Sequence, residues 1–167
     1  MKKTLMTGLA LLLLGTTLNA QEIEMFDTNG QGYKVSAQND EIKIEGMEGK
    51  VIFLEFFGLN CPGCKQAMPH LINLQDKYPQ KLQVMAIEVQ KNDIDPINLY
   101  KQEHGINYTT FSNFDVGYMT RYIADKSGWS GAIPFTVIID AQGTVQLTKI
   151  GAISENTLEE YIEQYSK

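Results

Sequence analysis

The sequence predicts an α/β fold in which a mixed central sheet carries helices on both faces. Strand-like and helix-like segments alternate from residue 51 to residue 124, and this alternation is typical of parallel strands joined by helical connections. Two further strand-like segments, 135–140 and 144–150, are separated only by a three-residue turn containing Gly143, which predicts a hairpin. The hairpin adds antiparallel pairing, so the sheet is expected to be mixed.

Composition places the chain among ordinary globular proteins. Of its 167 residues, 43% are hydrophobic and 20% are charged, which excludes a collagen-like, coiled-coil or wholly disordered chain. The net charge is −6, and this acidic balance argues against nucleic-acid binding. Two cysteines are too few for a miniprotein held together by disulfides.

Residues 1–20 have the layout of an export signal. The chain starts with two lysines, continues with a short apolar core at 5–14, and reaches a small residue at Ala20. Cleavage after Ala20 leaves one domain over 21–167, in a periplasmic or other extracytoplasmic compartment where disulfides persist. The alternative is an uncleaved membrane anchor, because the uncharged run at 4–21 is just long enough to span a bilayer.

The first elements of this domain are expected to be strands. Residues 22–26 and 33–35 flank a glycine-containing turn at 27–30, which predicts a hairpin. Residues 41–44 alternate polar and apolar side chains, as a strand with one exposed face does.

Residues 51–57, VIFLEFF, are apolar except for Glu55, which predicts a central strand buried on both faces. A helical pattern follows at 65–77, with a kink expected at Pro69 because proline cannot donate a backbone hydrogen bond.

The remaining elements follow from similar signals. Residues 82–89 form a second strongly apolar strand, and Asp95-Pro96 is expected to open a helix that ends before Gly105. A short strand and a short helix are expected at 106–111 and 115–124. After the hairpin, Ser154 can cap a last helix. Its apolar face consists of Leu158, Tyr161, Ile162 and Tyr165.

The strongest chemical signal is the motif Cys61-Pro62-Gly63-Cys64, which lies where the central strand gives way to a helix. Two residues between the cysteines, on a first helical turn, let the sulfurs meet in a disulfide. The positive end of the helix dipole would stabilise a thiolate at Cys61, and only a thiolate attacks disulfides at a useful rate. The motif therefore predicts a redox-active pair.

Three other uses of the thiols fit the sequence less well. A closed zinc site needs four ligands, and the two histidines, His70 and His104, are far apart along the chain. A permanent structural disulfide that closes so short a loop stabilises little. Cu(I) held between the two thiolates is the third alternative, with His70 as the one nearby candidate for a further ligand.

These segments resemble the thioredoxin superfamily, and within it the extracytoplasmic TlpA/ResA-like branch. The resemblance is carried by FFGLNCPGC at 56–64, by Met68-Pro69, and by GAIPFTVIID at 131–140 with Gly143 in the following turn. It implies a thioredoxin-like three-layer fold with an N-terminal β-hairpin and a central strand–helix insert. It also implies a protein-disulfide oxidoreductase that needs neither a cofactor nor a metal.

The resemblance assigns roles position by position. Cys61 matches the attacking cysteine and Cys64 the buried resolving cysteine, and these two form the redox disulfide. Pro134 matches a cis-proline that faces the pair, and the backbone of Ile133 matches the residue that pairs with a bound peptide. Two more positions of the substrate-binding surface lie within the motif itself, Pro62 and Gly63.

Two single residues complete the expected site. Glu55 lies six residues before Cys61, where similar enzymes often carry a buried acid. Its apolar neighbours should raise its pKa toward neutrality, so that it could exchange a proton with Cys64; the alternative is a glutamate turned to solvent. Trp129 lies near Pro134 in the sequence and is expected either to line the substrate groove or to pack within its loop.

The implied function is the reduction of disulfides in exported proteins, with a membrane redox donor that recharges the enzyme. Cytochrome c maturation is one such use, because haem attachment needs reduced cysteine pairs. The dipeptide Pro62-Gly63 carries no charged or histidine group that would strongly lower the pKa of Cys61, which favours a reductant. The reverse direction, a DsbA-like oxidase, is the alternative.

Overall fold

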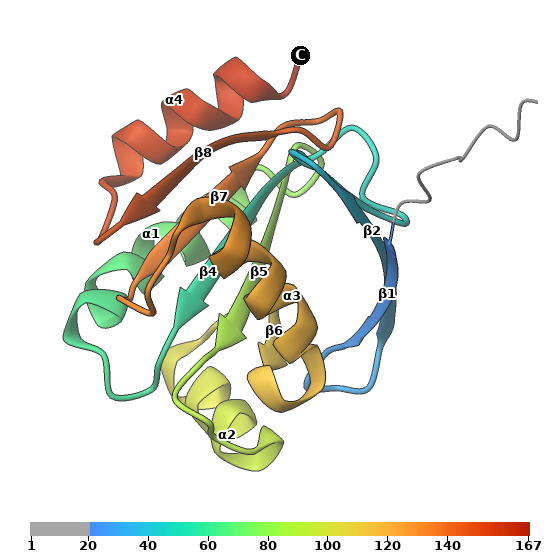
Figure 1. The fold of residues 1–167 in the computed structure, drawn as a ribbon. Helices are drawn as coiled ribbons and strands as arrows, with labels where there is room; N and C mark the ends of the chain where they lie inside the picture. The colour runs from blue at the N-terminus through green and yellow to red at the C-terminus, as the bar shows by residue number, and fades with distance from the viewer. Residues whose placement is uncertain (1–20) are drawn as a thin grey trace, which may run out of the picture.

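The computed structural model describes residues 21–167, and the expected export signal at 1–20 lies outside this range. The main sheet has five strands in the order β6-β5-β4-β7-β8 (Figure 1). In chain order these are β4 (Val51–Phe57), β5 (Leu82–Glu88), β6 (Thr109–Ser112), β7 (Phe135–Ile139) and β8 (Val145–Ile150). Strands β4, β5 and β6 are parallel, whereas β7 is antiparallel to both β4 and β8. The mixed sheet expected from the sequence is confirmed.

A second, smaller sheet forms the start of the described chain. Strands β1 (Gln21–Phe26), β2 (Gly32–Gln38) and β3 (Glu41–Ile44) pair antiparallel in that order. The carboxylate of Asp27 holds the turn between β1 and β2 by accepting bonds from the backbone of Asn29 and Gln31. The expected N-terminal hairpin is therefore present, and the strand at 41–44 extends it to three strands.

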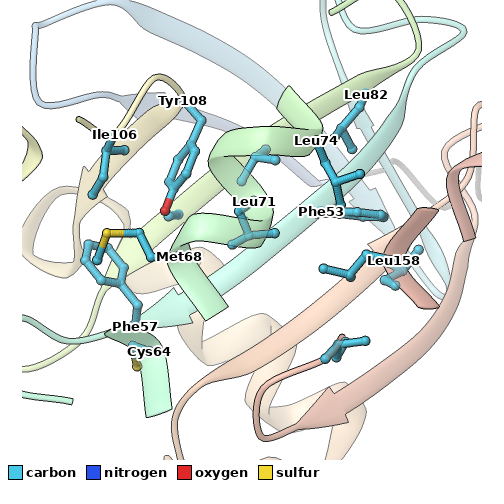
Figure 2. Close-up of a cluster of buried hydrophobic side chains, with 14 of the residues drawn as sticks. Phe53, Phe57, Cys64, Met68, Leu71, Leu74, Leu82, Ile106, Tyr108 and Leu158 are labelled. Atoms are coloured by element: carbon cyan, nitrogen blue, oxygen red, sulfur yellow. The ribbon is translucent and has the colours of Figure 1, made fainter. Parts of the chain in front are cut away.

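Strand β4 forms the centre of the molecule, and every one of its residues is buried. Because side chains alternate along a strand, Phe53 and Phe57 belong to one hydrophobic cluster, while Leu54 and Phe56 belong to another. Helices α1 (Pro62–Lys77), α2 (Ile94–His104) and α4 (Glu155–Tyr165) contribute to the first cluster, part of which is drawn in Figure 2. Helix α3 (Asn113–Ser127) and the small sheet contribute to the second. The main sheet is therefore the middle of three layers, with α1, α2 and α4 on one face and α3 with the small sheet on the other.

The boundaries of several elements differ from the expected ones. Helix α1 begins at Pro62 and runs through Pro69. Helix α2 begins at Ile94, one residue before the expected cap, with Asp93 in the capping position. Strand β6 is confined to Thr109–Ser112, and helix α3 extends the expected segment at both ends.

Within residues 21–167, no helix is both long enough and apolar enough to cross a membrane.

Candidate active site

The two cysteines lie where β4 passes into α1. After β4 ends at Phe57, a short turn leads to Cys61, which occupies the capping position of the helix with an extended backbone. The sulfur of Cys61 accepts a hydrogen bond from the backbone N–H of Cys64 at 3.1 Å. The two residues form a disulfide, and both are buried. Pro62 occupies the first helical position, where its missing N–H leaves no helical bond unmade.

This placement favours nucleophilic chemistry at Cys61. In the reduced protein its sulfur would lie at the positive end of the α1 dipole, beside a backbone N–H that is free to stabilise a thiolate. Both cysteines belong to the cluster of Phe57 and Met68, but Cys64 lies inside the first turn whereas Cys61 lies at the capping position before it. The local geometry therefore makes the two thiols unequal.

Pro134 lies directly against this motif. The Ile133–Pro134 peptide bond is cis, as the sequence resemblance implied. A β-carbon built on Gly63 would lie 3.0 Å from Cδ of Pro134, so the two residues are already in close contact. Gly63 is thus the residue that lets the start of β7 approach the first turn of α1. Ile133 is half-buried and packs against both hydrophobic clusters.

Glu55 is buried at the centre of β4, with 3% of its surface exposed. It stands opposite Ala86 on β5 and Thr136 on β7, and it faces the α1 side of the sheet together with Phe53 and Phe57. Among the described residues no group donates a hydrogen bond to its carboxyl. Burial raises the pKa of Glu55 from its usual 4.5 to about 8. The structure therefore excludes the alternative of a solvent-facing glutamate.

Two tyrosines, one on α2 and one just before β6, lie in the electrostatic field of Glu55. Burial and the nearby Glu55 carboxyl together raise the pKa of Tyr108 well above its usual value, and they raise that of Tyr100 as well. Both residues belong to the cluster that holds Cys64 (Figure 2 shows Tyr108). These two neighbours of Glu55 are therefore neutral at physiological pH.

Trp129 is packed inward. Its ring stacks on Phe135 with centroids 4.9 Å apart, and it contacts Phe56 at 4.8 Å. Its indole N–H donates to the carbonyl oxygen of Ala132 at 2.7 Å. Trp129 thus supports the loop that leads to Pro134. Its predicted contact with substrate stays a prediction.

The possible metal ligands do not gather around the thiols. The ring of His70 bonds the backbone carbonyl of Ile153 at 3.1 Å, and His104 stacks on Tyr100. Across residues 21–167, no group of three or more histidine, cysteine or acidic side chains is arranged to hold a metal ion.

One contact to the motif was missed by sequence reasoning. The side-chain oxygen of Gln90, in the loop after β5, accepts a hydrogen bond from the backbone N–H of Asn60 at 3.0 Å. A single loop glutamine carries no sequence signal, and the one available hint was the buried acid Glu88 at the end of an apolar strand.

Comparison with known proteins points to one family. The profile of the AhpC/TSA family matches residues 20–148. Thiol-disulfide oxidoreductase ResA of Bacillus subtilis (strain 168) is 24% identical over 145 residues, which cover 86% of this chain and 72% of that protein. The protein of the same name from Halalkalibacterium halodurans is 22% identical over 127 residues, covering 75% and 68% of the two chains.

Solved structures share the fold. A thiol:disulfide interchange protein of the thioredoxin family from Chlorobium tepidum TLS superposes with a TM-score of 0.69 at 17% identity, covering 89% of this chain and 95% of that one. A secreted disulfide oxidoreductase from Mycobacterium tuberculosis gives a TM-score of 0.63 at 19% identity, covering 85% and 95%. The thioredoxin-like fold implied by the sequence is confirmed.

Proposed function

The chain belongs to the AhpC/TSA family and is a thiol–disulfide oxidoreductase, and on that premise we propose that it reduces disulfides of exported proteins outside the cytoplasm. The observation that carries the proposal is the Cys61–Cys64 pair at the start of α1, in contact with the loop of Pro134 through Gly63. The reactive sulfur of Cys61 needs such a neighbour, because the backbone before Pro134 can pair with the chain that contains the target disulfide.

The reaction starts with the reduced enzyme. The Cys61 thiolate attacks one sulfur of the substrate disulfide, the substrate S–S bond breaks, and the other substrate sulfur leaves as a thiolate that takes up a proton. Cys64 then attacks the Cys61 sulfur of the mixed disulfide and releases the second substrate thiol. Two electrons pass to the substrate, and the enzyme is left with the disulfide seen in this structure.

Glu55 serves as the proton carrier for Cys64 in this scheme. With a pKa of about 8 it is mostly protonated near neutral pH, and the smaller ionised fraction can accept a proton without a large energetic cost. It lies on the same side of the sheet as the cluster that contains Cys64. When Cys64 attacks, its proton goes to ionised Glu55, and it returns when the enzyme disulfide is reduced again.

Substrate binds across the surface next to the cysteines. The backbone of Ile133 pairs with an extended segment of the substrate, in the manner of an added strand. Pro62 and Gly63 adjoin this segment, and Gly63 has no side chain that would push the Pro134 loop away from the cysteines. Trp129 supports the loop of Ile133 through its hydrogen bond to the Ala132 carbonyl.

The direction of electron flow and the location of the protein rest on further observations. Pro62-Gly63 supplies no positive charge that would strongly stabilise the Cys61 thiolate, which favours a reductant over a DsbA-like oxidase. The basic, apolar N-terminus favours export, and the structurally similar M. tuberculosis protein is described as secreted. A membrane donor would then supply electrons, and apocytochrome c cysteines are one substrate of suitable chemistry.

The proposal is tested by trapping the mixed disulfide. Cys64→Ser lacks the resolving thiol, so it should accumulate as a covalent adduct with an exported protein or with oxidised insulin, joined through Cys61. The matched variant Cys61→Ser should form little adduct. Adducts that map to Cys64 when both cysteines are present would reverse the assigned roles, and a failure of the wild type to reduce insulin would contradict the proposed function.

A further inference from the structure

The loop after β5 is unusually well fixed for a surface connection. The carboxylate of Glu88, with no exposed surface, accepts hydrogen bonds from the backbone N–H groups of Gln90 and Asn92, both at 2.9 Å. It accepts a third from the side-chain amide of Asn92 at 2.8 Å. Between these anchors, Lys91 has a φ of 64°, a left-handed conformation that is unfavourable for a residue with a side chain. The hydrogen bonds to Glu88 offset the energetic cost of this conformation.

This fixed loop extends one side chain to the segment that precedes Cys61. The side-chain oxygen of Gln90 accepts a bond from the N–H of Asn60 at 3.0 Å. Gln90 also packs on Gly58, where a β-carbon would lie only 2.3 Å from its Cδ. The three atoms nearest to that position all belong to Gln90. Residue 58 therefore has no room for a side chain, because Gln90 occupies the space.

The contact constrains the backbone at the residue before the nucleophile. Cys61 caps α1 with an extended backbone, and its sulfur reaches the N–H of Cys64 only when that backbone is correctly placed. Strand pairing fixes the chain up to the carbonyl of Phe57, which accepts a bond from the N–H of Val89 at 2.9 Å. The bond from Asn60 to Gln90 is the next fixed point along the chain.

The same loop is joined to the elements that follow it, α2, β6 and α3. Ser112, at the end of β6, donates its hydroxyl hydrogen to the carbonyl of Asn92 at 3.1 Å, and its oxygen caps α3 by accepting from the N–H of Phe114 at 3.3 Å. Asp93, the next residue, takes the capping position of α2. Residues 88–92 therefore connect α2 and β6 with the turn before Cys61.

We propose that Gln90 is a positioning residue for Cys61: it holds the 58–60 turn at the start of α1 and so sets the reactivity of the nucleophile. The inference deepens the proposed thiol–disulfide exchange and rests on it. Gln90 itself exchanges no atom or electron with the substrate.

The test compares two substitutions that separate shape from hydrogen bonding. Gln90→Met keeps the length of the side chain and removes the acceptor, so Cys61 should react with a small disulfide about three- to tenfold more slowly. The pH profile of Cys61 alkylation, measured in the Cys64→Ser background, should also shift to higher pH. Gln90→Glu keeps an acceptor and should retain most of the rate at high salt, which screens the added charge.

A matched control and a double-variant cycle complete the experiment. Gln83→Met is the control, because Gln83 lies near the far end of β5 and bonds Thr109 and Val84 instead; its rate should equal that of the wild type. Gly58→Ala should displace the Gln90 side chain and slow the reaction of Cys61 as Gln90→Met does. In the cycle, Gly58→Ala combined with Gln90→Ala should be no slower than the slower single variant.

The outcomes distinguish a failure of the positioning role of Gln90 from a failure of the proposed function. A folded Gln90→Met protein with wild-type rate and alkylation profile would overturn the positioning role, as would fully additive losses in the cycle. A lower melting temperature with an unchanged alkylation profile would also overturn it, because that is the result of a merely structural role. If the wild type fails to reduce disulfides, the proposed function is wrong, whereas the alkylation profile still tests the positioning of Cys61.

Discussion

Replacing Glu55 with glutamine should make the oxidised protein more stable, and the gain should grow as the pH rises. Glutamine has nearly the same shape as glutamate but cannot ionise, so the variant removes only the titration. Glu55 is 3% exposed and its carboxyl has no hydrogen-bond donor among residues 21–167. An ionised carboxylate there is desolvated without compensation.

The size of the effect follows from the pKa. Burial raises the pKa of Glu55 from 4.5 in an ordinary setting to about 8 in the folded protein. Below about pH 4.5 the carboxyl is protonated in both the folded and the unfolded state, so burial carries no ionisation penalty. As the pH rises toward 8, the unfolded state releases the proton and the folded state retains it, so the wild type loses stability. Above about pH 8 the loss is constant.

Between about pH 5 and pH 8 the wild type should lose about 3–4 kcal/mol of stability relative to Glu55→Gln. The slope is about 1.4 kcal/mol per pH unit and becomes smaller near each of the two pKa values. Urea unfolding of the two oxidised proteins at several pH values measures this difference. Trp129 is the single tryptophan of the sequence and is buried, so its fluorescence reports unfolding directly. Glu24→Gln, at an exposed position of β1, serves as the control for simple removal of a charge.

A stability difference that stays the same from about pH 5 to pH 8 would refute the reasoning, because the folded carboxyl would then titrate as an exposed one does. The variant should also reduce disulfides more slowly, with a weaker pH dependence. If the pH–rate profiles of the two proteins superimpose while the stability difference follows expectation, Glu55 is buried and protonated but does not carry the proton of Cys64.

Two further variants test the surroundings of the cysteines. Gly63→Ala places a β-carbon 3.0 Å from Cδ of Pro134, so it should slow exchange with a protein substrate more than with a small disulfide; equal slowing, measured with both substrates, would contradict a role in substrate binding. Trp129→Phe retains the ring packing but loses the bond to the Ala132 carbonyl, and it should cost about 1–3 kcal/mol of unfolding free energy, measured by circular dichroism. Unchanged stability and unchanged amide exchange at residues 130–133 would show that the indole does not support this loop.

The centre of the fold could be read from the sequence because its signals are local and strong. An unbroken apolar run predicts burial on both faces, and β4 is buried at every position. The same reasoning placed Glu55 in the interior, since a single acid within such a run has no polar face to occupy. The cysteine spacing similarly indicated a disulfide at a helix start, which the structure contains.

The ends of helices and strands were less predictable, because the residues near them fit more than one structural position. Asp95-Pro96 reads as a cap followed by a first helical residue, yet Asp93 is the cap and Pro96 is the third residue of α2. Proline is tolerated there because the N–H groups of the first turn have no helical partner. Ile106 and Tyr108 alternate as strand residues do, but they fill the core from a connection, and pairing with β5 starts only at Thr109.

The contact of Gln90 with Asn60 could not be predicted, because it joins residues 30 positions apart through one side chain. Gln90 belongs to no motif, and the neighbouring Lys91 adopts a left-handed conformation that its residue type does not predict. Such contacts depend on the final placement of two loops, which only the assembled sheet determines.

The reduction potential of the Cys61–Cys64 pair tests the central claim most directly. It is measured by equilibrating the protein with glutathione or thioredoxin redox buffers and quantifying the two states by alkylation. A disulfide reductase should have a potential near about −270 mV, at which the dithiol gives up electrons readily to protein disulfides. A potential near about −120 mV would contradict the account, because the pair would then donate its disulfide to exported proteins and act as an oxidase.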